Sequence, residues 1–230
     1  MAWSPESSRV FSVGMDGRLK AWPSSAPPEA RVLRGHPGSV LRIAFSPDGT
    51  RLVSSGTPVE RELTAEDASD NTIRVWDAAT GTQLLTLTEH KKTVFGLAWS
   101  PDGKHIASGS EDRSLRVWDS SSGARQLLLP SLEGSVQSVA FSPDGELVAG
   151  VAGYAATLWK VSDGSQYRRL PHNDTLLMVA FSPDGRWLAT SLARGEIRIW
   201  DLHSEGEHRS IVTGPGSNGA WFSPDSTVIA

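Results

Sequence analysis

The chain has 230 residues, 38% of them hydrophobic, and a formal net charge of −4 from 22 basic and 26 acidic residues. This balance, without a broad basic field, argues against nucleic acid as a partner. The absence of cysteine excludes disulfides, thiolate metal sites and a cysteine nucleophile, and it fits a cytoplasmic location. No stretch reaches about 18 apolar residues and the first residues lack a signal-peptide pattern, so we expect no membrane partner.

One short sequence, Phe-Ser-Pro-Asp-Gly at residues 45–49, recurs along the chain. The copies share an aromatic residue followed by Ser-Pro and an acidic residue, and they begin at Trp3, Phe45, Trp99, Phe141, Phe181 and Phe222. The steps between these positions are 42, 54, 42, 40 and 41 residues. A period of about 40–45 residues is typical of a propeller blade, so the chain is expected to form one array of repeats.

Each repeat contains signals for four short strands, which are clearest around Trp99. The predicted elements are a strand at 93–99, a turn at 100–103, and further strands at 105–109, 114–118 and 125–129. The first strand is apolar nearly throughout, whereas the third alternates apolar and polar residues. Because such a meander is stable only when neighbours cover its faces, we predict an all-β propeller of four-stranded antiparallel blades.

Trp-Asp pairs close the third predicted strand at Trp76, Trp118 and Trp200, and histidines precede the first strand at His36 and His90. Together with the period, these motifs resemble the WD40 repeat family of β-propellers over essentially the whole chain. The single array is then divided into about five repeats, with the boundaries 1–35, 36–89, 90–131, 132–171, 172–213 and a partial 214–230.

Two arrangements of the chain ends stay open. Residues 220–230 repeat the part of the unit that residues 2–13 occupy, so they complete the first blade of a closed ring or belong to an arc of a larger propeller. Ending within a strand, on Val228-Ile229-Ala230, favours an incomplete ring, because an unpaired apolar edge promotes aggregation. We therefore expect the chain to continue into further blades or another domain of the parent protein.

The WD40 resemblance implies a hydrogen-bonded tetrad of Asp, His, Ser or Thr, and Trp in each blade. The matching residues are His36, Ser54, Asp70 and Trp76 in the second repeat, and His90, Ser108, Asp112 and Trp118 in the third. Ser, His and Asp also build catalytic triads, but a group that recurs in each blade with Trp on the hydroxyl is interpreted as structural. We predict no catalytic residues, no cofactor and no metal site, and interpret the His- and carboxylate-rich residues 201–208 as a turn.

Departures from this pattern distinguish the repeats. The first keeps Ser12, Asp16 and Trp22, while the fourth has Leu132, Gly150 and Gly153 where His, Ser and Asp are expected, and the fifth has Arg194 in place of Asp. Because a complete tetrad joins three strands and a loop, the second and third repeats are predicted to be the most rigid and the fourth the loosest.

Two groups of residues are candidates for binding a partner. Residues 57–68 enlarge one connection of the second repeat and include Glu60, Arg61 and Leu63. Long loops on a rigid scaffold often carry function. Three cationic residues, Lys91, Lys92 and Arg113, are expected to share one loop face, where they suit an acidic or phosphorylated peptide.

The predicted function is that of a non-enzymatic scaffold for protein–protein or protein–peptide interaction. The uniform Phe-Ser-Pro-Asp-Gly turns resemble those of bacterial members of the family, and this resemblance implies a regulatory or partner-binding arm of a larger signalling protein. The alternative is a propeller that binds small, glycan-like ligands or acts as an enzyme. Identical pockets would require the same residues after each histidine, but Pro37, Lys91 and Asn173 differ. The scaffold interpretation is therefore favoured.

Overall fold

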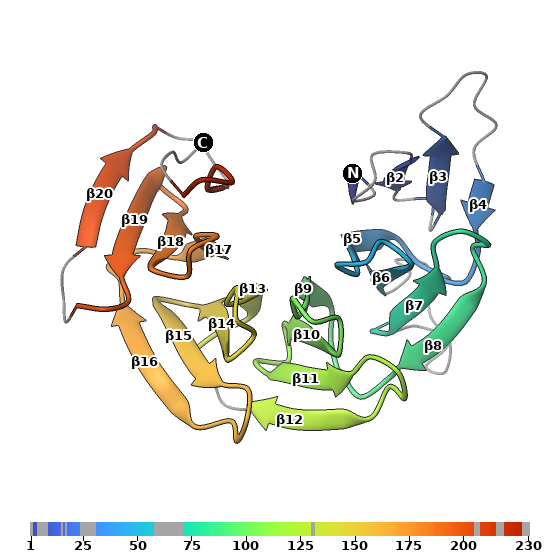
Figure 1. Ribbon diagram of the computed structural model, residues 1–230, viewed down its shortest axis with the longest axis horizontal. Helices are drawn as coiled ribbons and strands as arrows, with labels where there is room; N and C mark the ends of the chain where they lie inside the picture. The colour runs from blue at the N-terminus through green and yellow to red at the C-terminus, as the bar shows by residue number, and fades with distance from the viewer. Residues whose placement is uncertain are drawn as a thin grey trace, which may run out of the picture.

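The structure is a computed structural model. It describes residues 2–3, 9–14, 16, 18–23, 31–57, 71–129, 132–204, 208–214 and 219–226. In this part of the chain the regular structure is β-strand, arranged in five four-stranded antiparallel sheets that follow one another along an arc (Figure 1). The predicted all-β propeller of four-stranded blades is thus confirmed.

Each sheet is a meander of consecutive strands, and the sheets are called blades one to five in chain order. Blade one contains β1 (Ala2–Trp3), β2 (Arg9–Val13), β3 (Leu19–Pro23) and β4 (Arg31–Leu33). Blade two contains β5 (Val40–Phe45), β6 (Arg51–Gly56), β7 (Ile73–Asp77) and β8 (Gln83–Leu87). Blade three contains β9 (Val94–Trp99), β10 (His105–Ser110), β11 (Leu115–Asp119) and β12 (Arg125–Leu129).

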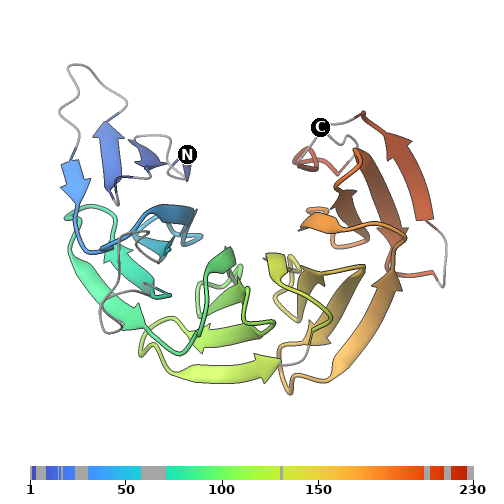
Figure 2. The same ribbon diagram turned by 180° about the vertical axis from the view of Figure 1, so that it is seen from behind.

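Blade four contains β13 (Val136–Phe141), β14 (Leu147–Ala152), β15 (Ala155–Lys160) and β16 (Gln166–Pro171). Blade five contains β17 (Leu176–Phe181), β18 (Trp187–Leu192), β19 (Glu196–Asp201) and β20 (His208–Val212). The first strand of each blade lies on the inner side of the arc and the fourth on its outer side (Figures 1 and 2). Blades one and five lie at opposite ends, so the described strands form an open arc.

The recurrent Ser-Pro-Asp-Gly turn joins the first strand of a blade to the second. In blade three the Ser100 hydroxyl donates to Asp102 Oδ1 at 2.6 Å and accepts from the His105 amide at 2.9 Å. Gly103 has φ +70°, a left-handed conformation that glycine adopts without steric cost. The hydrogen bond from Ser100 lowers the pKa of Asp102, so the carboxylate stays ionised and keeps the turn closed.

The apolar cores lie between neighbouring blades. One cluster joins Val53 and Val75 of blade two to Trp99 and Ile106 of blade three. The inner strands approach so closely that a Cβ on Gly96 would come within 3.0 to 3.2 Å of the backbone of β13. Each blade therefore buries its faces against its neighbours, as expected for an array in which single blades are not stable alone. Among the described residues, no helix has the length and apolarity needed to cross a membrane.

Candidate functional site

A chain of hydrogen bonds crosses blade three from its third strand to a loop. The Trp118 indole N–H donates to Ser108 Oγ at 2.8 Å, and Ser108 Oγ lies 2.8 Å from His90 Nε2. His90 Nδ1 lies 2.9 Å from Asp112 Oδ2. Because a carboxylate only accepts, Nδ1 donates to Asp112 and the neutral imidazole accepts the Ser108 hydroxyl proton at Nε2. All four predicted side chains of blade three are therefore brought together.

Asp112 also organises the loop between β10 and β11. Its Oδ1 accepts from the amide and the hydroxyl of Ser114, and its Oδ2 accepts from the Lys91 amide at 3.0 Å. Burial opposes ionisation of Asp112, but the hydrogen bonds from His90, Ser114 and Lys91 outweigh it and hold the pKa of the carboxyl well below its usual range. Asp112 is therefore a carboxylate at neutral pH.

His90 is held in its neutral form. Burial lowers the pKa of the imidazole, and the hydrogen bond from Nδ1 to Asp112 opposes this shift only in part. His90 is 4% exposed and Ser108 is 0% exposed, and the Ser108 hydroxyl already bonds both Trp118 and His90. A buried hydroxyl whose bonds are used in this way has no path to attack a substrate.

Blade two has the same contacts at the residues that the structure describes. The Trp76 indole N–H donates to Ser54 Oγ at 2.7 Å, and His36 Nε2 lies 2.7 Å from the same oxygen. Asp70, the predicted fourth member, lies outside the described residues. In blade one, the Trp22 indole N–H donates to Ser12 Oγ at 2.9 Å. The Trp–hydroxyl contact thus recurs from blade to blade.

Blade five replaces the missing aspartate with a backbone group. His172 Nε2 lies 2.8 Å from Thr190 Oγ1, which accepts from the Trp200 indole N–H at 3.2 Å. His172 Nδ1 donates to the Leu170 carbonyl at 2.9 Å, the position that Asp112 takes in blade three. Sequence reasoning missed this substitution, because nothing in the identity of Leu170 marks its carbonyl as an acceptor.

Blade four has Leu132 and Gly150 at the positions of the histidine and the serine, and a cavity lies beside Leu132. Gly150 pairs with Thr157 in the β14–β15 register, as Ser108 pairs with Arg116 in blade three. The cavity has a volume of about 180 Å³ and its lining includes Leu132, Thr157 and Trp159. Only two residues, 153 and 154, join β14 to β15, whereas four join β10 to β11. Gly153, at the place of Asp112, lies in this short turn and has no side-chain acceptor.

The cationic residues predicted to bind a partner lie around the loop that Asp112 organises. Lys91, Lys92 and Arg113 are exposed, and the backbone contact between Lys91 and Asp112 places them near one another. Lys92 Nζ forms an ion pair with Glu111 Oε1 at 3.2 Å, which reduces the net positive charge of this face. Most of the insertion at residues 57–68, including Glu60, Arg61 and Leu63, lies outside the described residues.

The residues at 201–208 were expected to form a turn and not a metal site. Asp201 pairs with Arg186 at 2.9 Å, and its Oδ1 accepts from the His203 amide at 3.0 Å. Residues 205–207 lie outside the described part of the chain. No group of three or more metal-ligating side chains occurs among the residues that are described.

A residue that sequence reasoning overlooked spans the junction between blades two and three. Arg51 Nη1 donates to the Ser120 carbonyl at 2.8 Å, and Nη2 donates to the Gly103 carbonyl at 3.1 Å. Its guanidinium lies 4.8 Å from the centre of the Trp99 ring, a cation–π contact. The available signal was the second position after Ser-Pro-Asp-Gly, where Arg51, His105, Leu147 and Trp187 differ between repeats that otherwise match.

Five four-stranded meanders along one arc, four of which have the same Trp–hydroxyl contact, define a β-propeller array. The family profile described as "IFT122 first beta-propeller" matches residues 57–230, and the one described as "WD domain, G-beta repeat" matches residues 28–77. The chain therefore belongs to the WD40 repeat family of β-propellers.

Curated relatives match about half of the chain or less. Coronin-7 of Bos taurus is 30% identical over 118 residues, which cover 47% of this chain and 12% of coronin-7. Nuclear distribution protein PAC1 of Coccidioides posadasii is 36% identical over 89 residues, covering 39% of this chain and 18% of that protein. Ribosome assembly protein 4 of Chaetomium thermophilum is 33% identical over 103 residues, which cover 45% of this chain and 16% of that protein. The matches thus span a small part of each relative's length.

These relatives correct one prediction. The resemblance to bacterial members of the family was wrong as a guide to origin, because the relatives named above are eukaryotic. The uniform Phe-Ser-Pro-Asp-Gly turns follow from the backbone conformation that each turn requires, so they carry little information about lineage. The family and its relatives support an interaction scaffold, and nothing among them favours a glycan-binding or enzymatic propeller.

Proposed function

We propose that the chain is a non-enzymatic scaffold that binds protein or peptide partners through its loop faces. The observation that carries this proposal is the state of Ser108 and His90, the pair that most resembles catalytic machinery. Both are buried and engaged with Trp118 and Asp112, so they support the blade and are not available for chemistry. The same contacts recur in other blades, as a structural role requires.

The two predicted tetrads belong to this proposal as its rigid frame. His36, Ser54, Asp70 and Trp76 would hold blade two, and His90, Ser108, Asp112 and Trp118 would hold blade three. A frame of this kind keeps exposed loops in place, which lowers the conformational entropy lost when a partner binds. The same proposal includes the repeat boundaries given above. It also includes a cytoplasmic location and a regulatory role in a larger signalling protein.

The proposed contact surface is the loop face around Lys91, Lys92 and Arg113, together with the insertion that contains Glu60, Arg61 and Leu63. Supporting this choice, the three cations are exposed beside a loop that Asp112 holds in place. Exposed cations on an ordered loop suit acidic or phosphorylated peptides, since charge-assisted hydrogen bonds gain strength from fixed geometry.

A peptide array tests this proposal directly. The protein is applied to acidic, phosphorylated, basic and neutral peptides, and the double variant Lys91→Glu/Lys92→Glu is compared with Lys104→Glu, which alters the Ser-Pro-Asp-Gly turn of the same blade. Binding of acidic or phosphorylated peptides that falls about tenfold in the double variant but not in the control would support the proposed face. An array without any bound peptide, or equal binding by all three proteins, would contradict it.

Deletion of residues 58–68 tests the insertion separately. Thr57 is kept because its amide donates to the Ser39 carbonyl at 2.8 Å and so belongs to the frame of blade two. We expect the shortened protein to fold with an unchanged melting temperature and to lose affinity for peptides selected on the array. Unchanged affinity would remove the insertion from the contact surface.

A further inference from the structure

The junctions between successive blades have the same backbone geometry. A Cβ on Gly103 would lie 3.8 Å from Pro47 Cδ, and a Cβ on Gly185 would lie 3.7 Å from Pro143 Cδ. The Ser120 amide donates to the Lys104 carbonyl at 2.8 Å in blade three, and the Leu202 amide donates to the Arg186 carbonyl at 2.9 Å in blade five. The junction of blades four and five can therefore be compared residue by residue with that of blades two and three.

At the junction of blades two and three, Arg51 supplies the side chain that joins the two blades. Its guanidinium donates to the Gly103 and Ser120 carbonyls and to the Ser120 hydroxyl, at 2.8 to 3.3 Å, and lies over the Trp99 ring. Two carbonyl oxygens and an aromatic face thus form a receptor that suits a guanidinium group. A planar cation with several donors satisfies these acceptors at the same time.

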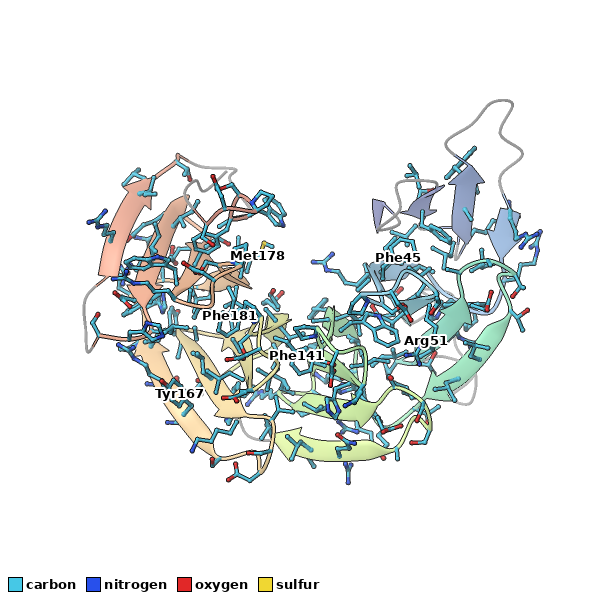
Figure 3. The ribbon with its side chains drawn as sticks, viewed as in Figure 1. Phe45, Arg51, Phe141, Tyr167, Met178 and Phe181 are labelled. Atoms are coloured by element: carbon cyan, nitrogen blue, oxygen red, sulfur yellow. The ribbon has the colours of Figure 1, made fainter. Side chains whose placement is uncertain are left out.

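The junction of blades four and five has the receptor but not the arginine. Leu147 occupies the position of Arg51, Gly185 and Leu202 occupy the positions of Gly103 and Ser120, and Phe181 occupies that of Trp99. Figure 3 labels Arg51 at the first junction and Phe181 at the second. Because a leucine side chain has no donors and the Leu147 amide donates to Ser142 Oγ, the two carbonyls of this junction receive no hydrogen bond from residue 147.

A groove is present where the arginine is missing. It has a volume of about 590 Å³ and is lined by Leu147, Phe181, Gly185 and Leu202, among others. Tyr167 of β16 also lines it and is 47% exposed, so the groove has a second aromatic ring besides that of Phe181 (Figure 3). A volume of this size accepts a long side chain and part of the segment that carries it.

The charges around the groove are compatible with a cation. Asp144 and Glu146 contribute two carboxylates to the lining, against one ammonium group from Lys160. Arg168, which comes from the same strand as Tyr167, is already held by the Asp201 carbonyl at 3.1 Å, and Arg186 is paired with the Asp201 carboxylate. The two carboxylates of the lining outnumber its one ammonium group, which favours a positively charged occupant over a negative one.

We infer that the groove between blades four and five is a binding site for an arginine side chain of a partner peptide. The guanidinium takes the place that Arg51 holds at the other junction, donating to the Gly185 and Leu202 carbonyls and lying against Phe181 and Tyr167. This inference rests on the proposed peptide-binding function and names a different surface and a different partner chemistry from the Lys91 face.

The test is an NMR titration of the isotopically labelled chain with the blocked tripeptides acetyl-Gly-Arg-Gly-amide and acetyl-Gly-citrulline-Gly-amide. We expect the arginine peptide to shift the amide signals of Arg186 and His203, which follow the two acceptor carbonyls. We expect the uncharged citrulline peptide to bind about tenfold more weakly, because it lacks charge-assisted hydrogen bonds. Equal binding of the two peptides, or no shift of these amides, would overturn the inference.

Two substitutions exchange the properties of the junctions. Leu147→Arg should fill the groove from within the chain and abolish the arginine-dependent shifts, while Leu147→Met, which conserves volume, should retain them. Arg51→Leu should create a second site, seen as new shifts at Lys104 and Ser121. If Arg51→Leu does not fold, the Leu147 pair still decides: binding that persists in Leu147→Arg would exclude this groove. If the arginine peptide does not bind in this groove but acidic peptides still bind the Lys91 face, the inference is wrong and the proposed function is retained.

Discussion

Blades three and four are adjacent and share one strand order, but they stabilise their outer strands differently. In blade three the indole of Trp118, 1% exposed, ends a chain of hydrogen bonds that reaches Asp112. In blade four Trp159, 7% exposed, lines a cavity and has Gly150 where the serine would be. Both blades form the same sheet, so the fold does not require the polar network, and we expect the network to determine how firmly a blade is held.

The largest effect is expected from Ser108→Ala. Two buried partners, the Trp118 indole and His90, each lose a hydrogen bond at about 1–3 kcal/mol, so we expect a loss of about 3 kcal/mol in the free energy of unfolding. Chemical denaturation measures it. Ser191→Ala is the matched control, since the Ser191 hydroxyl is buried with no hydrogen-bond partner in the described part of the chain. Equal losses in both variants would contradict a special role for the Ser108 network.

Native-state hydrogen exchange compares the two blades without substitution. We expect the amides of β11 in blade three to exchange about tenfold more slowly than those of β15 in blade four, because their opening breaks the network as well as the sheet. Both strands are central in their sheets, which makes the pair a fair comparison. Faster exchange in β11 than in β15 would show that the network does not limit local opening.

Mild acid should weaken blade three more than blade four. Burial lowers the pKa of His90 below its ordinary value of 6.5, so the unfolded chain binds a proton at a higher pH than the folded chain. The contribution of His90 is therefore complete above pH 6.5 and is lost as the pH falls toward the folded pKa. Unfolding free energies at pH 7 and pH 5.5 measure this loss, which His90→Gln should remove; an unchanged pH dependence in that variant would contradict it.

The smallest effects concern the turns between the second and third strands. Gly153 of blade four has φ +58° and Arg113 of blade three has φ +65°. Gly153→Ala should lower stability by about 1 kcal/mol, because a Cβ is unfavourable in this conformation. Arg113→Gly should raise stability by about 0.5 kcal/mol, as relief of this strain exceeds the added freedom of the unfolded chain. Thermal unfolding of the two variants is the measurement, and a gain for Gly153→Ala together with a loss for Arg113→Gly would exclude strain as the cause.

The positions of the strands and turns could be predicted because they depend on neighbours in the sequence. The predicted strand at 105–109 and the turn at 100–103 correspond to β10 and to the turn that Ser100 closes. The contacts of His90, Ser108 and Trp118 could be inferred only from the resemblance, since the residues are far apart in the chain. The rigidity assigned to blade three remains a prediction.

Other features had no signal that sequence reasoning could use. The Leu170 carbonyl accepts from His172 because β16 ends beside that histidine, and a backbone acceptor is the same at every residue. Gly150 has little space for a side chain, since an added Cβ would lie 2.7 Å from Leu115 Cδ1 of blade three. The close packing of blade three against this position therefore explains why blade four has glycine here and not serine.

The sequence by itself determined the repeat, the turns and the order of strands, because local backbone preferences and a period of about 40–45 residues suffice for them. Only the tertiary structure decided which positions are filled and which are open. Arg51 fills one junction, whereas Leu147 leaves a groove of about 590 Å³ at another. Whether a junction is filled or open depends on distances between side chains of neighbouring blades. The repeat motif is nearly the same in every blade, so it carries no information about these distances.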